Sequence, residues 1–233
     1  AVIDTGLDFT HLELISNLWA NPGEMGTDAN GNDKSSNGID DDVDGFIDDV
    51  FGWNFVDNNN DFTDLNGHGT HSAGIIAASM DNSLGIVGVS PEARIMALKV
   101  LDSTGHGTYA QVAQAIIYAV DHGARVINLG FGGQADSQAL RDATDYAYSH
   151  GVVVVAAAGN GGSTVPYYPA ANPNVIAVVA LDPFLNLTSF SAYGYTYSVA
   201  APGVSIYSTL PGGEFGHMTG TSMAAAEVSG VAA

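Results

Sequence analysis

Ser222 and Asp4 are of residue types that could take part in nucleophilic chemistry. Ser222 lies in Gly-Thr-Ser-Met-Ala, between small residues at the start of an expected helix that ends at Ala233. The amide end of a helix favours an oxyanion that develops beside a serine hydroxyl, although a serine alone at this place is more often an N-cap. Asp4 follows an apolar strand, where an aspartate is also commonly a helix cap or a turn residue.

A histidine that could act as a base stands in residues 66–74, Asn-Gly-His-Gly-Thr-His-Ser-Ala-Gly. Small residues flank His68 and a helix of small apolar residues follows, so the imidazole can stand at a helix start, close to the backbone. A zinc site formed by His68 and His71 is a weaker interpretation, because the segment lacks a Glu-His pattern and a third ligand nearby.

Residues 28–64 form a long Asn/Asp/Gly-rich loop with eleven acids and a single base, Lys34, and so carry half of the net charge. Long loops in compact domains are usually functional or flexible. Asp40, Asp42 and Asp44 alternate before a turn glycine, as at the start of a calcium loop, but the twelfth position is Phe51, so an EF-hand is incomplete. We expect these acids to bind a structural Ca²⁺ ion; a solvated acidic loop is the alternative.

The elements that position these residues follow from hydrophobic patterning. Apolar, β-branched runs predict buried parallel strands at Ala1–Ile3, Ala93–Leu101, Arg125–Leu129, Val152–Ala158 and Val175–Leu181. Helices are expected at Thr108–His122 and Asp136–His150, each ending before a glycine. This alternation predicts an α/β fold, a three-layer, doubly wound, mostly parallel sheet with helices on both faces and ligand chemistry at the carboxyl ends of the strands.

The composition excludes several classes of protein. The chain has 233 residues, 25 Asp and Glu against 5 Lys and Arg, a net charge of −20, and no cysteine. Such a surface repels nucleic acid and anionic membranes, and disulfides or thiolate zinc sites cannot form. With 46% hydrophobic residues and no apolar run of membrane-spanning length, we expect one globular domain over residues 1–233.

Five ordered segments resemble motifs of the subtilisin-like serine proteases, the subtilases. They are VIDTG at 2–6, NGHGTHSAG at 66–74, AAAGN at 156–160, APGVSI at 201–206 and GTSMA at 220–224. The order Asp, His, Ser is also that of subtilisin. The resemblance covers nearly the whole chain and implies a subtilisin-like fold in a secreted serine endopeptidase.

The resemblance also implies a role for each of four residues. Ser222 would be the nucleophile, His68 the general base and then general acid, and Asp4 the group that holds the imidazole tautomer. The side-chain amide of Asn160 and the backbone N–H of Ser222 would form the oxyanion hole. Such an enzyme hydrolyses polypeptides through an acyl-enzyme, and we expect a monomer whose partners are its substrates and an inhibitory pro-segment.

Two further segments resemble those that pair with an extended peptide and wall the primary specificity pocket. They comprise Gly105, His106, Gly107, and Leu129, Gly130, Phe131, Gly132. Gly130-Phe131 stands where the family commonly has Ser-Leu, so Phe131 is expected to alter the shape of the pocket. A dinucleotide-binding interpretation of the glycines after Leu129 is rejected, because the next strand ends in Gly-Asn instead of delivering an acid for a ribose.

A second calcium site is implied by the resemblance alone. Residues 80–86 resemble the family's structural calcium loop, in which an Asn side chain, here Asn82, and alternate carbonyls bind the ion. The acid that completes the site maps to Glu13, which is longer than the usual aspartate.

The chain also departs from the family pattern. Ala226 stands where the family has proline, and the match stops short at both ends, so we expect an internal fragment of a longer precursor. A competing interpretation is a calcium-stabilised pseudoenzyme or binding module of the same fold, inactive because of the truncation and of Ala226. Labelling by a fluorophosphonate probe separates the two.

Overall fold

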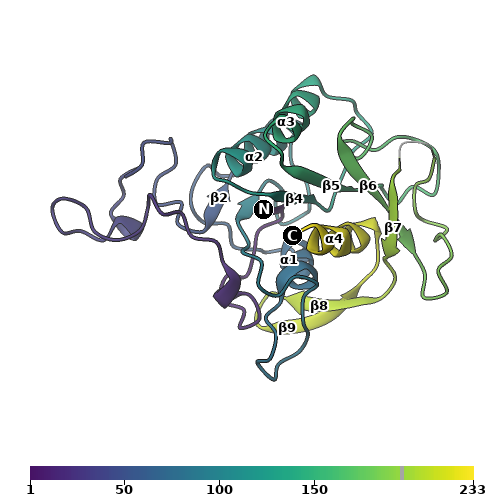
Figure 1. Cartoon of the computed structure of the whole chain (residues 1–233), viewed down its shortest axis with the longest axis horizontal. Coiled ribbons are helices and arrows are strands. Elements are labelled where there is room, and N and C mark those ends of the chain that lie inside the picture. Colours follow the sequence, from purple (N-terminus) through teal and green to yellow (C-terminus); the bar gives the residue numbers. More distant parts are fainter. Residues whose placement is uncertain (195–196) are drawn as a thin grey trace.

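A seven-stranded parallel sheet forms the centre of the structure, a computed structural model that describes residues 1–194 and 197–233. Its strands are β1 (Val2–Asp4), β2 (Gly52–Asn54), β3 (Ala97–Lys99), β4 (Val126–Leu129), β5 (Val153–Ala157), β6 (Val175–Leu181) and β7 (Val199–Pro202). They lie in the order β2-β3-β1-β4-β5-β6-β7, and all neighbours are parallel (Figure 1). The five strands expected from the sequence are present, β3 is shorter than expected, and β2 and β7 were not predicted.

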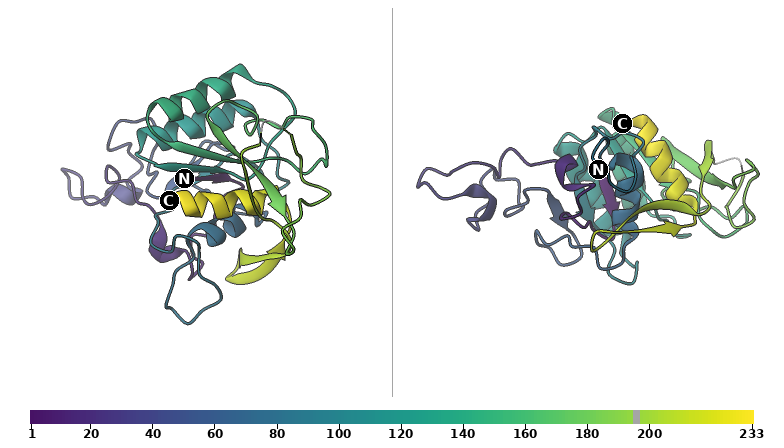
Figure 2. Two further views of the ribbon diagram at one scale, coloured as in Figure 1. Left: turned by 45° about the vertical axis from the view of Figure 1, so that its right-hand side comes forward. Right: turned by 90° about the horizontal axis from the view of Figure 1, so that it is seen from below.

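Helices cover both faces of this sheet. The helices α2 (Tyr109–Asp121) and α3 (Gln138–Ser149) lie side by side on one face, while α1 (His68–Ala77) and α4 (Thr221–Ala232) lie on the other (Figures 1 and 2). A capping box starts α2, because the hydroxyl of Thr108 accepts from the N–H of Gln111 and the side chain of Gln111 accepts from the N–H of Thr108. The predicted three-layer α/β fold is confirmed.

A hairpin of β8 (Ile206–Leu210) and β9 (Glu214–Met218) packs against α1 and was not predicted. Buried His71 joins the two, because its Nε2 lies 3.1 Å from the carbonyl oxygen of Ile206 and 3.2 Å from that of Gly216. Burial lowers the pKa of His71, which favours the neutral ring, and the two carbonyl contacts assign a proton to Nε2. These contacts give His71 a structural role in joining α1 to the hairpin, as an alternative to the weaker interpretation that it binds zinc with His68.

The registers of the central strands place the sequence motifs side by side. Ile3 of β1 pairs with Leu98 of β3 and with Leu129 of β4, and all three side chains are fully buried. Asp4 and Gly130 directly follow Ile3 and Leu129, so both emerge at the same edge of the sheet. The apolar core thus fixes the backbone on which the site is built.

The first part of the acidic loop extends away from the sheet as an irregular segment (Figures 1 and 2). It contains one 3₁₀ turn, Lys34–Ser36; another turn, Ile15–Asn17, precedes the loop. The prediction that residues 28–64 form a loop throughout is wrong for Gly52–Asn54, which form the edge strand β2 of the sheet. None of the helices in the described part of the chain has the length and apolarity that crossing a bilayer requires.

Candidate active site

Asp4 and His68 form a hydrogen-bonded pair in which Asp4 is buried and His68 is partly exposed. Asp4 ends β1 with its side chain fully buried, and His68 is the first residue of α1. The ring Nδ1 lies 2.7 Å from Asp4 Oδ1, which also accepts from the N–H of Thr5 at 2.8 Å. Because a carboxylate only accepts, this contact assigns the proton of the neutral imidazole to Nδ1 and leaves Nε2 as the base.

The electrostatic surroundings favour the protonated form of His68. Burial of the ring lowers the pKa of His68, but the charge of Asp4, its hydrogen bond and the charge of Asp64 together raise the pKa above its ordinary value. A base with a raised pKa holds an abstracted proton more strongly. The arrangement therefore suits an imidazole that takes a proton during a reaction.

Ser222 lies close to Asp4 and His68, and all three residues surround Gly130. The serine is the second residue of α4 and is 7% exposed. A Cβ built on Gly130 would lie 3.1 Å from His68 Cε1, 3.2 Å from Asp4 Oδ2 and 3.5 Å from Ser222 Cβ. All three side chains thus converge on one backbone position, as an Asp-His-Ser triad requires. The helix continues unbroken through Ala226, where the family's proline is absent.

Asn160 directs its amide nitrogen toward the same place. Its Oδ1 accepts from the N–H and from the hydroxyl of Thr221, both at 3.0 Å, so Nδ2 points the other way. A Cβ on Gly220 would lie 3.3 Å from Asn160 Nδ2 and 3.8 Å from the backbone nitrogen of Ser222. Both nitrogens thus lie within 4 Å of one point at the start of α4, a proximity that an oxyanion hole formed by these two groups requires.

A cleft of about 360 Å³ opens at these residues. Of the predicted substrate-binding residues, Gly105, Gly130, Phe131 and Gly132 line it together with His68, Asn160 and Ser222. Three others do not line it. Leu129 is fully buried in the sheet, His106 Nδ1 lies 2.9 Å from the hydroxyl of Thr104, and a Cβ on Gly107 would lie 2.1 Å from the carbonyl oxygen of Val100.

Tyr167 also lines the cleft, and sequence reasoning missed it. A Cβ on Gly159 would lie 2.5 Å from its ring, so the ring lies flat against the backbone that carries Asn160. The side chain of Gln134 donates to the Tyr167 hydroxyl at 3.3 Å. Nothing in the local sequence marks this tyrosine, because the contact depends on glycines of a neighbouring strand end.

The predicted calcium ligands of the acidic loop fall into two groups that share Asp42. Asp40 and Asp42 lie with Glu24, and Asp42 and Asp44 lie with His122, with the ligand atoms of each group within 4.8 Å of one another. His122 Nε2 is 2.7 Å from Asp44 Oδ2. Sequence reasoning missed Glu24 and His122, since neither belongs to the alternating acidic motif.

Glu13 and Asn82, the residues of the second implied calcium site, lie in contact. Asn82 Nδ2 donates to Glu13 Oε2 at 2.9 Å, and Glu13 is fully buried. The N–H of Ile86 donates to Glu13 Oε1 at 3.3 Å, and that of Leu84 to Asn82 Oδ1 at 3.0 Å. The structure brings the two residues together, with their oxygens already accepting hydrogen bonds.

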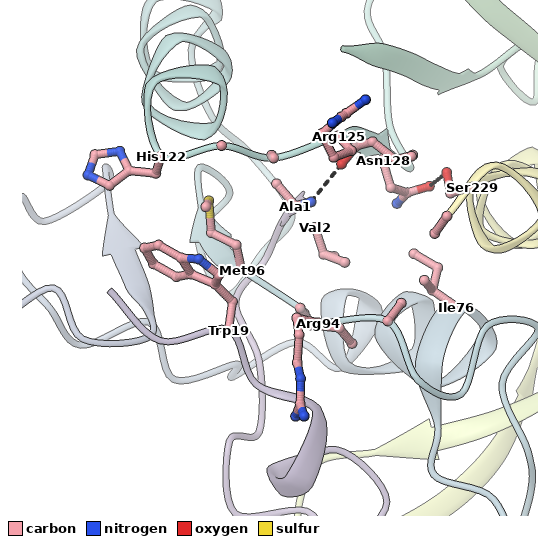
Figure 3. A pocket seen from close by; sticks show the side chains of 16 residues that line it. Ala1, Val2, Trp19, Ile76, Arg94, Met96, His122, Arg125, Asn128 and Ser229 are labelled. Carbon is pink, nitrogen blue, oxygen red and sulfur yellow. Dashed lines mark hydrogen bonds between the residues drawn. The ribbon is translucent and has the colours of Figure 1, made fainter. Parts of the chain in front are cut away.

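A second pocket, of about 260 Å³, lies at the opposite end of the central strands, near the start of β1 and the end of α4 (Figure 3). Trp19 and Met96 line one side, and Asn128 and Ser229 line another, with the Ser229 hydroxyl donating to Asn128 Oδ1 at 2.9 Å. Asp4, His68 and Ser222 are not among its lining residues. The candidate chemistry therefore belongs to the cleft.

A serine, a histidine and an aspartate that converge in this way on a doubly wound parallel sheet are typical of subtilisin-type hydrolases. The chain belongs to the subtilase family (peptidase S8), whose family model matches residues 1–233.

Its relatives are proteinases. The thermophilic serine proteinase of Bacillus sp. (strain AK1) is 46% identical over 233 residues, which is 100% of this chain and 50% of that proteinase. Thermitase of Thermoactinomyces vulgaris is 52% identical over 181 residues, 78% of this chain and 65% of thermitase. A crystal structure of a cold adapted subtilisin-like serine proteinase superposes with a TM-score of 0.79 at 30% identity, covering 99% of this chain and 71% of the other. The chain thus spans half to two thirds of the length of these sequence relatives.

Proposed function

We propose that the chain carries the activity of a serine endopeptidase. The observation that carries this proposal is the convergence of Asp4, His68 and Ser222 on Gly130, with the amide of Asn160 facing the same cleft. Relatives that are named as proteinases support the endopeptidase function, and they give no support to the pseudoenzyme interpretation. Ala226 lies within an unbroken helix, so its departure from proline does not displace Ser222 from the helix start.

In this proposal each group has one task. Ser222 Oγ attacks the scissile carbonyl carbon while its proton passes to His68 Nε2, and Asp4 stabilises the imidazolium that forms. The oxyanion receives hydrogen bonds from Asn160 Nδ2 and from the N–H of Ser222. His68 then protonates the leaving amine as the C–N bond breaks, and water, deprotonated by the same imidazole, hydrolyses the acyl-enzyme.

A fluorophosphonate probe tests the nucleophile directly. We expect a covalent adduct on Ser222 in the wild-type chain and none in Ser222→Ala, because only the activated serine attacks the probe. Ser149→Ala, a change of a surface serine on α3, is the matched control and should label like the wild type. Unlabelled wild type, or equal labelling of Ser222→Ala, would contradict the proposal.

The proposed setting of the enzyme follows from the family. We infer that it acts outside the cell as a monomer on polypeptide substrates and that a pro-segment inhibits it before activation. Membership of a family that includes subtilisins and thermitase supports this inference.

We also propose a structural calcium ion at Glu24, Asp40 and Asp42. Glu24 is fully buried, and its Oε2 has no hydrogen-bond partner among residues 1–194 and 197–233, while its Oε1 accepts from the N–H of Asp41 at 2.7 Å. Burial raises the pKa of Glu24, which the Asp41 hydrogen bond opposes and the charges of Asp42 and Asp49 reinforce. A hard cation bound by several carboxylate oxygens would relieve both the burial and the repulsion.

Thermal unfolding with and without chelator tests this site. With Ca²⁺ at about 100 times its Kd, we expect the Tm of the wild type to rise by roughly 5 to 10 °C. Glu24→Gln should lose most of this rise, whereas Asp28→Asn, a change of a nearby acid outside both ligand groups, should keep it. An equal rise in both variants would remove Glu24 from the site.

The second proposed calcium site, at Glu13 and Asn82, is tested separately. Asn82→Ala removes the side chain that contacts Glu13 and should abolish any calcium-dependent rise in Tm that Glu24→Gln leaves behind. If Glu24→Gln alone abolishes the whole rise, the contact between Glu13 and Asn82 is a protein hydrogen bond without an ion.

A further inference from the structure

Asp64 is a buried carboxylate next to the triad with an unusually complete set of partners. It is 3% exposed and accepts five hydrogen bonds from four residues. Its Oδ1 accepts from the Thr5 hydroxyl at 2.9 Å and from the N–H groups of Asn66 at 3.0 Å and Gly67 at 2.8 Å. Its Oδ2 accepts from the N–H and the hydroxyl of Thr70 at 2.9 and 2.7 Å.

These bonds hold the start of α1. The N-cap of the helix is Gly67, which has no side chain to cap the first turn. Asp64 binds the free N–H groups of Gly67 and Thr70 in its place, and its negative charge lies at the positive end of the helix. His68, the first residue of this helix, therefore takes its position from Asp64.

Thr5 connects the same carboxylate to the other half of the triad. Its hydroxyl donates to Asp64 and accepts from the N–H of Gly69 at 2.9 Å, while its own N–H donates to Asp4 Oδ1. Asp4 and His68 are thus each adjacent to a residue held by Asp64. The network joins the end of β1 to the start of α1, across the gap that the bond between Asp4 and His68 spans.

The charges around His68 come from several elements. Asp4 faces the ring from β1, and Asp64 lies before α1; both charges favour the imidazolium. Burial lowers the pKa of His71, one turn further along α1, and so favours its neutral form. Lys99 of β3 points at the chain after β1, where its Nζ donates to the carbonyl oxygens of Thr5 at 2.5 Å and Thr63 at 3.1 Å.

We propose that Asp64 is a positioning residue of the catalytic site, which holds Thr5 and the first turn of α1 so that Asp4 and His68 stay aligned, and whose charge adds to the stabilisation of the imidazolium. This inference rests on the proposed endopeptidase function. Asp64 does not line the cleft and acts through Thr5 and His68.

Asp64→Asn, compared with wild type in the full chain, tests the proposal. With activity expressed per titrated active site, we expect kcat on a peptide substrate to fall by about 10- to 100-fold, because small misalignments of catalytic groups have effects of this size. KM should change less than kcat, since Asp64 itself does not line the cleft. The acid limb of kcat/KM should move to lower pH, because the imidazolium loses one of its two stabilising charges.

Asp61→Asn is the matched control. It removes the same charge three residues upstream, at an exposed position whose carboxylate, within residues 1–194 and 197–233, accepts only from the backbone and hydroxyl of Thr63. We expect its kcat and its acid limb to match those of the wild type. If Asp64→Asn resembles this control in both readouts, or loses only Tm, the carboxylate is structural and the proposal is overturned.

Variants of Thr5 keep the test open if Asp64→Asn does not fold. Thr5→Val keeps the shape and the Asp64 charge but removes the hydroxyl that joins Asp64 to Gly69, so kcat should fall. Thr5→Ser restores the hydroxyl and should restore kcat; equal activity of the two variants would contradict the proposal. Failure of the wild type to label with fluorophosphonate would instead overturn the endopeptidase function itself.

Discussion

Asp64 and Glu24 are both buried carboxylates, yet their surroundings shift the pKa in opposite directions. Burial raises the pKa of Asp64, but its hydrogen bonds, first those from Gly67 and Thr70, outweigh this and lower it. Glu24 has one backbone donor and neighbouring acids, and its pKa is raised. The difference teaches that donors, more than depth, decide whether a buried acid is stable as an anion. For Asp64 the backbone at the start of α1 supplies most of those donors, whereas for Glu24 we propose that a cation bound with Asp40 and Asp42 takes their place.

The largest expected effect separates the two regions by activity. Asp4→Asn should lower kcat by about 10⁴-fold, because an amide can donate to Nδ1 and so favours the wrong imidazole tautomer. Asp28→Asn, at the start of the acidic loop, should leave kcat within about twofold. Steady-state kinetics normalised to titrated sites measure both. A comparable loss in Asp28→Asn would break the distinction between the two regions.

The pH dependence of activity sharpens the comparison on the side of the cleft. The neutral imidazole is the base, so kcat/KM should fall about tenfold for each unit by which the pH drops below the pKa of His68. Because the pKa of His68 is raised from 6.5, this limb should lie above that value in the free enzyme. A profile of kcat/KM against pH measures it, and a limb at or below 6.5 would show that burial outweighs the two carboxylates.

The smallest effect concerns stability on the side of the acidic loop. Asp49 is fully buried and accepts from Asn21 Nδ2 at 2.8 Å and from the hydroxyl of Tyr118. Tyr118→Phe leaves this carboxylate with one donor fewer and should lower the free energy of unfolding by about 1–3 kcal/mol, measured by urea in the presence of chelator.

Tyr146→Phe is the control for this change. It removes an exposed hydrogen bond from a tyrosine hydroxyl to Asp121 and should alter stability by less than about 0.5 kcal/mol. Neither variant should change kcat per active site. Equal losses of stability in the two variants would show that burial of Asp49 adds nothing to the contribution of its hydrogen bond.

The sequence predicted the sheet where strands are continuous apolar runs, as in β4, β5 and β6. It missed β2, which is only Gly-Trp-Asn, and the β8–β9 hairpin, whose strands mix polar and apolar residues without a clean alternation. Such short or mixed strands owe their conformation to tertiary partners, here β3 and α1.

The candidate site shows the same limit. Asp4, His68, Asn160 and Ser222 were found because each stands in a distinctive local motif, and the structure brings them together. Asp64 and Glu24 were not singled out, because their importance lies in contacts with residues distant in sequence. Thr5 and Asp64, for example, are 59 positions apart. Local patterns cannot reveal such contacts.

The order of Asp4 and Ser222 in the sequence has a consequence for biosynthesis. A ribosome delivers Asp4 with β1, but Ser222 emerges only after β2 to β9. A nascent chain that ends before Ser222 therefore holds no complete triad. A cell that makes this chain would be shielded from its proposed activity until translation has passed Ser222, by the order of the residues alone.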